Sequence, residues 1–167
     1  MCGIAGSLHL QGGTVDPLRL RKMIAAIHHR GPDDTGIYVD GPVGLAHARL
    51  SIIDLSGGHQ PMAIANDSLW ITFNGEIFNF RELRNKFLQH VTFHSTSDTE
   101  VLLNLYILLG KECLNQLNGF FAFAVYDRQT QQIFLARDRY GIKPLLIYSD
   151  EEKIVFASEL KALLAFS

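Results

Sequence analysis

The sequence predicts an α+β fold in which stacked β-sheets are covered by helices. Many short β-rich runs are distributed along the chain, and the few helical patterns are grouped mainly in its middle. Residues 120–126, FFAFAVY, are nearly all apolar and do not alternate, which is typical of a strand buried on both faces. Because such a strand needs a packed layer on each side, stacked sheets fit better than a single sheet with one face in water.

The first third of the chain is expected to form three strands and one helix. A strand covers 3–10, and a helix begins at Asp16-Pro17, where an acidic N-cap precedes a proline at the first helical position. This helix ends near 28–30, where positive side chains suit the C-terminal end of the helix dipole. Two further strands, 36–39 and 43–47, are joined by a turn. The helix face expected to pack on the core carries Leu20, Met23, Ile24 and Ile27.

The middle of the chain combines a strand with two capped helices. Residues 69–73 are β-rich and end at Asn74-Gly75, a pair typical of turns. Asn79-x-x-Glu82 and Ser97-x-x-Glu100 have the capping-box pattern and predict two helix starts, and Gly110 is expected to stop the second helix. The remaining elements expected are a short helix at 113–117, strands at 133–137, 145–148 and 154–157, and a last helix capped by Ser158.

Length and composition indicate one globular domain that spans residues 1–167. Hydrophobic residues make up 47% of the chain and charged residues 19%, and the formal net charge is −2. The sequence has no basic run for nucleic acid, no apolar stretch of the roughly 18 residues that a membrane span needs, and no secretory signal. Two cysteines do not make a disulfide framework, and seven histidines show no metal-ligand spacing. We therefore expect a cytoplasmic protein without a metal site.

Cys2 directly follows the initiator methionine, so that removal of Met1 gives it a free α-amino group. A thiol and an amine on one residue pair a nucleophile with a base, as in enzymes with an N-terminal threonine. While Met1 remains, the nitrogen of Cys2 is an amide and cannot act as a base. The alternative is a cysteine that stands at this position by chance, at the start of a glycine-rich strand.

Three other segments carry groups suited to amide hydrolysis through a thiol. Asn74 and the N–H of Gly75 can donate to a tetrahedral oxyanion, unless they form a plain Asn-Gly turn. Arg49 can bind an α-carboxylate with two parallel hydrogen bonds, or it forms a surface ion pair. Asp98, in the first turn of a helix, can pair with an α-ammonium group or simply complement the helix dipole.

The first residues of the chain, CGIAG at 2–6, resemble the N-terminus of class II glutamine amidotransferases, which are N-terminal nucleophile hydrolases. Further blocks resemble the same family in the same order, and the likeness extends to about residue 164. Three of them look most like the glutaminase half of glutamine-dependent asparagine synthetases: RGPD, RLSI and SELKAL. The blocks are RGPD at 30–33, RLSIID at 49–54, HQPM at 59–62, NGEIFN at 74–79, SDTE at 97–100, ARDR at 136–139 with Gly141 and Pro144, and SELKAL at 158–163.

This resemblance implies a fold and a set of roles. The fold is a four-layer αββα sandwich of two mainly antiparallel sheets. Cys2 would attack the carboxamide of L-glutamine, with its own α-amine as the base, to give a glutamyl thioester and ammonia, and water would then release glutamate. Asn74 and the Gly75 N–H would form the oxyanion hole. Substrate binding is implied for Arg49 at the α-carboxylate, for Glu76 and Asp98 at the α-ammonium group, and for the backbone of Leu50, Ser51, Ile52 and Ile53.

The resemblance also implies what receives the ammonia. A glutaminase domain supplies a synthetase or amidotransferase domain or partner, and asparagine synthesis is the expected reaction. The synthetase half of the related enzymes carries a Ser-Gly-Gly-x-Asp-Ser phosphate loop, whereas Ser56-Gly57-Gly58 in this chain is followed by His59-Gln60. We therefore expect no cofactor in this domain, and ATP and Mg²⁺ only in a synthetase domain that is absent from this chain.

The partners expected are L-glutamine and a synthetase domain or subunit, with a homo-oligomer as a further possibility. The alternative function is a catalytically idle module of the same fold that senses glutamine or acts as a scaffold. An intact set of Cys2, Asn74 and Gly75 favours the enzyme.

Overall fold

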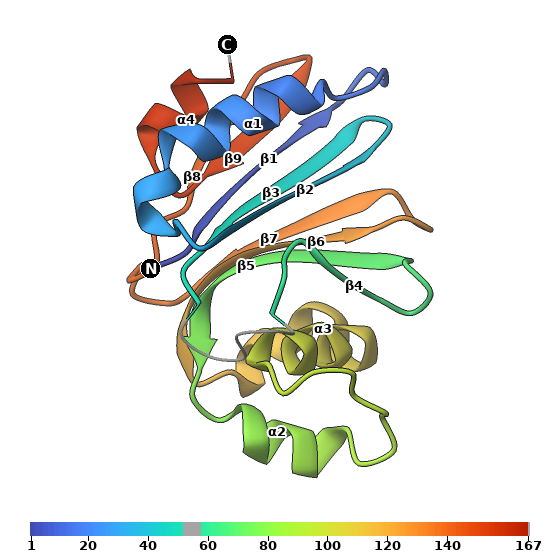
Figure 1. The fold of residues 1–167 in the computed structure, drawn as a ribbon. Helices are drawn as coiled ribbons and strands as arrows, with labels where there is room; N and C mark the ends of the chain where they lie inside the picture. Colours follow the sequence, from blue (N-terminus) through green and yellow to red (C-terminus); the bar gives the residue numbers. More distant parts are fainter. Residues whose placement is uncertain (52–57, 167) are drawn as a thin grey trace.

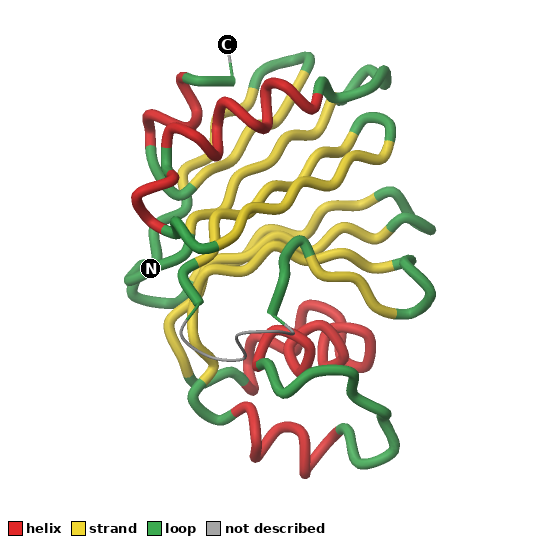
Figure 2. The backbone as a smooth tube through the Cα atoms, viewed as in Figure 1, coloured by secondary structure: helices red, strands yellow, loops and turns green. Residues whose placement is uncertain are grey.

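The computed structural model of the protein describes residues 1–51 and 58–166. Two stacked β-sheets form its centre, and helices cover the outer face of each sheet (Figure 1). The backbone coloured by secondary structure shows the same layers, with red helices outside the two yellow sheets (Figure 2). The predicted four-layer αββα sandwich of antiparallel sheets is therefore confirmed.

The first sheet has the strand order β2-β3-β1-β9-β8, and neighbouring strands are antiparallel. Gly3 pairs with Ala48, so the start of β1 lies beside the end of β3. Cys2, one residue before β1, is thereby placed next to Leu50. The strands of this sheet are β1 Gly3–His9, β2 Asp34–Asp40, β3 Val43–Arg49, β8 Leu146–Ser149 and β9 Lys153–Ala157.

The second sheet has the order β4-β5-β6-β7 and is also antiparallel. Its central strand β5 pairs with β6 along its whole length, but with the short strand β4 only as far as the Met62–Ile71 pair. From Phe73 onward, one edge of β5 therefore has no partner strand among the described residues. The strands of this sheet are β4 Met62–Ile64, β5 Leu69–Ile77, β6 Gly119–Asp127 and β7 Gln132–Arg137.

Two helices cover each sheet. The helices α1 (Pro17–Ala26) and α4 (Leu160–Leu164) pack on the first sheet, and α2 (Phe80–Phe87) and α3 (Asp98–Leu109) lie on the side of the second (Figure 1). Asp16 caps α1 as predicted, because its carboxylate accepts a hydrogen bond from the Leu18 N–H at 2.8 Å. Short 3₁₀ segments follow α1 and α3, at His28–Arg30 and Gly110–Gln116.

Strand β6 is buried on both faces, as the run of apolar residues predicted. Phe123 and Val125 face the core between the second sheet and α3, which also contains the buried thiol of Cys113. Ala124 and Tyr126 face the core between the two sheets. A third cluster lies between the first sheet and helices α1 and α4. Among the described residues, no helix combines the length and apolarity that crossing a membrane requires.

Three local predictions are wrong, each because a partner distant in the sequence outweighs a local pattern. Asn74-Gly75 does not form a turn, since β5 continues through both residues to Ile77 while paired with β6. The Asn79 side chain does not cap α2, because it bonds to backbone groups of residues 116 and 118 instead. Ser158 does not cap α4, since its hydroxyl accepts a hydrogen bond from the N–H of Ile4 at the start of β1.

Candidate active site

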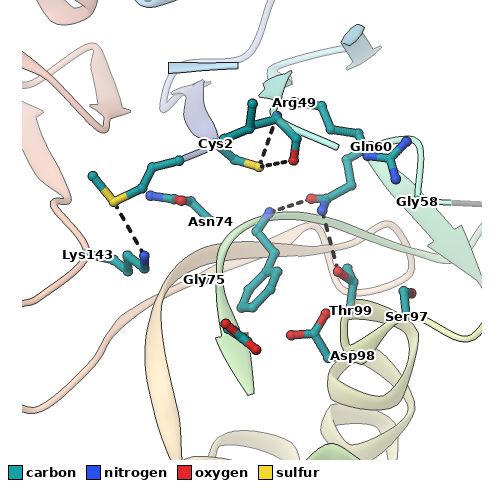
Figure 3. Close-up of a pocket in the computed structure, with 14 residues that line it drawn as sticks. Cys2, Arg49, Gly58, Gln60, Asn74, Gly75, Ser97, Asp98, Thr99 and Lys143 are labelled. Atoms are coloured by element: carbon teal, nitrogen blue, oxygen red, sulfur yellow. Dashed lines mark hydrogen bonds between the residues drawn. The ribbon is translucent and has the colours of Figure 1, made fainter. Parts of the chain in front are cut away.

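Predicted site residues from four separate parts of the chain line a single pocket at one end of the sandwich. Cys2 precedes β1, Arg49 ends β3, Asn74 lies in β5 and Asp98 begins α3 (Figure 3). Three more predicted residues, Leu50, Gly75 and Glu76, line the same pocket. The structure thus brings together groups that are up to 96 positions apart in the sequence.

Of the other predicted substrate-binding backbone residues, only Ser51 is described by the structure. The N–H of Ser51 donates to the carboxylate of Asp33 at 2.7 Å, and Ser51 does not line the pocket. Ile52 and Ile53 lie outside the described residues, and their predicted role stays a prediction.

The thiol of Cys2 lies against the backbone that follows β3. The N–H of Leu50 donates to Sγ at 3.4 Å, and Sγ in turn donates to the Leu50 carbonyl over 3.7 Å (Figure 3, dashed lines). A backbone N–H aimed at sulfur stabilises negative charge as it develops there. The Leu50 contact therefore both directs the thiol and suits its use as a nucleophile.

Arg30 holds the backbone of Cys2 from the other side, although sequence reasoning assigned it no role. Its Nε donates to the Cys2 carbonyl at 2.9 Å, and its Nη1 donates to the Glu159 carboxylate at 2.9 Å. The Arg30 hydrogen bond is the largest influence that lowers the pKa of Glu159 to about 2. Ser158 adds two hydrogen bonds to Ile4, each 2.9 Å, and so fixes the strand that begins at the nucleophile. In the sequence, the signal that could have pointed to Arg30 was its place in the RGPD block at 30–33.

The open edge of β5 directs backbone N–H groups toward the pocket. The N–H of Phe73 donates to Oε1 of Gln60 at 2.6 Å, and the N–H of Ile77 donates to Oδ2 of Asp98 at 2.9 Å. Along a strand, every second residue directs its N–H to the same edge. Gly75 stands between these two residues, so its N–H points to this edge as well.

The strand on the other side of β5 supports this orientation. Phe121 of β6 is paired with Gly75, but its own N–H and C=O are bonded to Asp138, at 3.2 and 2.8 Å. The pair of Gly75 and Phe121 is therefore one of the non-hydrogen-bonded pairs of the ladder. No described side chain accepts from the Gly75 N–H, which leaves it available to a ligand.

Asn74 supplies a second donor at the same place. The residue is 2% exposed, and among the described residues its side-chain nitrogen has no hydrogen-bond partner. A buried donor without a partner is rare, since it loses its hydrogen bonds to water without replacement. Figure 3 shows the Asn74 side chain beside Cys2. Together with the Gly75 N–H, it forms a pair of donors suited to an oxyanion.

Arg49 is 7% exposed, so the alternative of an arginine on the open surface is wrong. The backbone at Gly58 packs closely on its guanidinium, because a Cβ on Gly58 would lie 2.3 Å from Nη2. Both residues line the pocket. This packing orients a planar group that can bind a carboxylate in two parallel hydrogen bonds.

The position of Asp98 is compatible with both of its predicted roles. It is in the first turn of α3, where a negative charge complements the helix dipole, and it lines the pocket. Burial is the main influence that raises its pKa above the ordinary value, while hydrogen bonds from the backbone of Ile77 and Thr99 oppose the rise. The cost of burying this carboxylate falls when a cation enters the pocket.

Three further residues at the pocket or behind it were not assigned a role from the sequence. Gln60 lines the pocket, and His47 bonds the carbonyl of Phe73 from behind at 3.1 Å. Lys143 lines the pocket too, and its Nζ contacts Sδ of Met1 at 3.5 Å. Gln60 is in the HQPM block, which was the only sequence signal for it. His47 lies in β3 of the first sheet and Phe73 in β5 of the second, so no local sequence pattern marks their contact.

No group of three or more His, Cys, Asp or Glu side chains in residues 1–51 and 58–166 is arranged to hold a metal ion. The described cysteines, Cys2 and Cys113, are free thiols. Burial raises the pKa of Cys113 to about 11, which makes this thiol a poor nucleophile at neutral pH.

Comparison with known proteins identifies the family. The family model of the glutamine amidotransferase domain matches residues 1–167, and the chain belongs to this family. Asparagine synthetase [glutamine-hydrolyzing] 1 of Bacillus subtilis is 41% identical over 98% of this chain and 27% of that protein. Asparagine synthetase B [glutamine-hydrolyzing] of Escherichia coli is 39% identical over 98% of this chain and 30% of that protein. The chain spans 22 to 35% of the length of the curated relatives that it matches.

A solved structure supports the fold. Glutamine phosphoribosylpyrophosphate amidotransferase from B. subtilis matches with a TM-score of 0.81 and 23% identity, over 99% of this chain and 43% of that one. The chain therefore shares the sandwich fold of this amidotransferase, as expected from the sequence. The individual site assignments stay predictions, which the pocket geometry supports.

Proposed function

We propose that this chain hydrolyses L-glutamine to glutamate and ammonia, with Cys2 as the nucleophile. The observation that carries the proposal is the meeting, in one pocket, of this thiol with the unpartnered nitrogen of Asn74 and the edge N–H of Gly75. Arg49 and Asp98 place opposite charges in the same pocket. These charges match the α-carboxylate and α-ammonium groups of an amino acid, and the two donors match the oxygen of its side-chain amide.

The first half-reaction forms a thioester. Once Met1 is removed, the α-amine of Cys2 takes the proton from Sγ, and Sγ attacks the carboxamide carbon of glutamine. The carbonyl oxygen becomes an oxyanion, which accepts hydrogen bonds from Asn74 and Gly75. When the oxyanion collapses, the carbon–nitrogen bond breaks and the α-ammonium returns the proton to the departing nitrogen. Ammonia leaves, and glutamate remains bound to sulfur as a thioester.

The second half-reaction consumes one water. The α-amine takes a proton from water as the water oxygen attacks the thioester carbon, and the same two donors hold the second oxyanion. The carbon–sulfur bond then breaks, and the proton on the amine restores the thiol. Glutamine and water are thus converted to glutamate and ammonia, and the protein returns to its starting state.

Removal of Met1 is a condition of this mechanism. Met1 is 57% exposed and is therefore accessible to an aminopeptidase, which removes methionine readily before a small residue. It also lines the pocket, where its sulfur contacts Lys143. Its removal both frees the amine of Cys2 and clears space beside the nucleophile.

We further propose that the ammonia passes to a synthetase domain or subunit that makes asparagine. The support is that relatives matching 98% of this chain are named glutamine-hydrolysing asparagine synthetases and extend well beyond it. ATP and Mg²⁺ would be bound by that synthetase part, and we propose no cofactor for residues 1–167. A reducing cytoplasm suits the free thiols of Cys2 and Cys113.

The test combines N-terminal mass spectrometry with a measurement of ammonia release. We expect the purified chain to begin at Cys2 and to release ammonia from glutamine, and we expect Cys2→Ala to bind glutamine but to release none. Substantial turnover by Cys2→Ala would contradict the assignment of the nucleophile. A correctly processed chain that binds glutamine and releases no ammonia would instead be the idle sensing or scaffold module.

A further inference from the structure

We propose that His47 and Gln60 are positioning residues that hold the peptide groups of Phe73 and thereby aim the oxyanion donors of Asn74 and Gly75 at Cys2. The inference rests on the proposed glutaminase function and goes beyond it. It starts from the open edge of β5, where pairing with β4 stops at the Met62–Ile71 pair and no described strand continues the ladder.

At this edge, two side chains replace the missing strand. Phe73 needs an acceptor for its N–H and a donor for its C=O, and in a continued ladder both would come from the backbone. Instead, Oε1 of Gln60 accepts from the N–H at 2.6 Å, and Nε2 of His47 bonds the carbonyl at 3.1 Å. Gln60 is 6% exposed and His47 is fully buried, so water does not take over either bond.

The protonation state of His47 suits a donor to the Phe73 carbonyl. Burial is the main influence that lowers the pKa of His47 to about 4, so the ring is neutral at neutral pH and carries one N–H. The carbonyl of Phe73 can only accept, which places that N–H on Nε2. Nδ1 is left buried without a partner among the described residues. An apolar residue at position 47 would not bury an unsatisfied nitrogen. The contribution that sets the histidine apart is therefore the hydrogen bond that Nε2 donates to Phe73.

The oxyanion donors, Asn74 and Gly75, are the two residues that come directly after Phe73 in the chain. The carbonyl that His47 holds is bonded covalently to the nitrogen of Asn74, so its orientation sets the direction of the next residue. Farther along the same edge, Asp98 holds the N–H of Ile77 at 2.9 Å. Gly75 is thus fixed from both sides while its own N–H stays open.

Gln60 connects strand β5 with helix α3. Its Nε2 contacts Oγ1 of Thr99 at 3.5 Å, one residue beyond Asp98 in α3 (Figure 3). The same side chain therefore bonds the strand that carries the oxyanion donors and touches the helix that carries the proposed site for the α-ammonium group. We expect a displacement of Gln60 to move the donors relative to the bound substrate.

The test compares variants that delete these bonds with variants that keep them. His47→Leu and Gln60→Met remove the polar atoms at similar volume, whereas His47→Gln can keep a donor and Gln60→Glu an acceptor. Ammonia release is measured for each variant per titratable Cys2 thiol. Loss of a whole oxyanion donor lowers turnover about 10²–10³-fold, so we expect misaimed donors to lower kcat at least about tenfold. The Michaelis constant is expected to change by less than about threefold, and His47→Gln and Gln60→Glu to recover part of the loss.

The matched control is Thr72→Val. The Thr72 hydroxyl makes a similar buried bond between the sheets, donating to the Ala46 carbonyl at 3.1 Å, but it does not hold Phe73. We expect this variant to melt earlier and to keep kcat within about twofold of the wild-type value. If Thr72→Val loses as much kcat as His47→Leu, the effect is general loss of packing and the proposal is wrong.

Two further results separate failure of this inference from failure of the proposed function. Normal kcat in folded His47→Leu and Gln60→Met, with an active wild type and an inactive Cys2→Ala, overturns the positioning role alone. A processed wild type that releases no ammonia overturns the function and this inference with it. If the leucine and methionine variants do not fold, His47→Asn and Gln60→Asn, which stay polar but are too short to reach Phe73, are measured against the same expectations.

Discussion

Substitution of Gly75 by alanine tests the oxyanion hole through the backbone. A Cβ at this position would lie 2.3 Å from the carbonyl oxygen of Phe120 and 2.8 Å from the Cα of Phe121. Both atoms belong to the backbone of β6, so no side-chain rotation relieves the clash. An ordinary contact needs at least 3.4 Å, and β5 and β6 must therefore separate locally by about 1.1 Å.

This displacement is large on the scale of catalysis. A misplacement of about 1 Å can lower a rate by about 10²-fold, and loss of one oxyanion donor costs about 10²–10³-fold. We therefore expect Gly75→Ala to lower kcat by about 10²-fold. Arg49 and Asp98 come from other elements, so glutamine affinity should change much less.

The assay is steady-state ammonia release per titratable Cys2 thiol, with a melting curve for each variant. Gly6→Ala is the matched control, because a Cβ there would lie 2.3 Å from the Phe156 ring and 2.6 Å from the Gly44 carbonyl, and Gly6 does not line the pocket. We expect both variants to melt earlier and only Gly75→Ala to lose kcat. Normal kcat in folded Gly75→Ala would remove the Gly75 N–H from the mechanism.

Three further substitutions separate catalysis from binding. Asn74→Ala should lower kcat by about 10²–10³-fold with a much smaller change in the Michaelis constant, and normal turnover in the folded fraction would exclude its donor role. Arg49→Lys should raise the Michaelis constant strongly, because lysine keeps the charge but loses the planar fork; an unchanged constant would place the α-carboxylate elsewhere. Burial raises the pKa of Asp98, so as pH falls Asp98 loses its charge at a higher pH than an exposed carboxyl does, and glutamine affinity should fall with it. Because the pKa of Asp98 is raised in the folded state, this carboxyl lowers the stability of the folded protein as pH rises through that pKa. Asp98→Asn should therefore keep or raise the melting temperature at neutral pH while it weakens glutamine binding. A lower melting temperature with unchanged binding would contradict this.

The layers of the fold were predictable because they follow from local patterns. The apolar run in β6 required packing on both faces, and the structure has it. The Asp16-Pro17 helix start is confirmed by its cap, which is a contact between neighbours in the sequence. Side chains that act within one turn of their own position are readily inferred from sequence.

The errors concern residues whose partners are distant. Asn74-Gly75 has the composition of a turn, but pairing with β6 keeps it in a strand, and this is what exposes the Gly75 N–H to the pocket. Ser158 resembles a helix cap, yet its hydroxyl bonds Ile4, more than 150 positions away. The candidate nucleophile and binding groups were predicted one by one, whereas the groups that hold them, such as His47 on Phe73, depend on which strands are neighbours.

The central claim, that Cys2 forms a thioester with glutamine, is tested most directly by trapping the intermediate. The processed protein is mixed with glutamine, quenched rapidly in acid and digested, and the peptides are weighed by mass spectrometry. We predict a glutamyl adduct on the peptide that begins at Cys2, released by hydroxylamine and absent from Cys2→Ala. Ammonia release without any such adduct, or an adduct on Cys113 instead, would contradict the proposed mechanism.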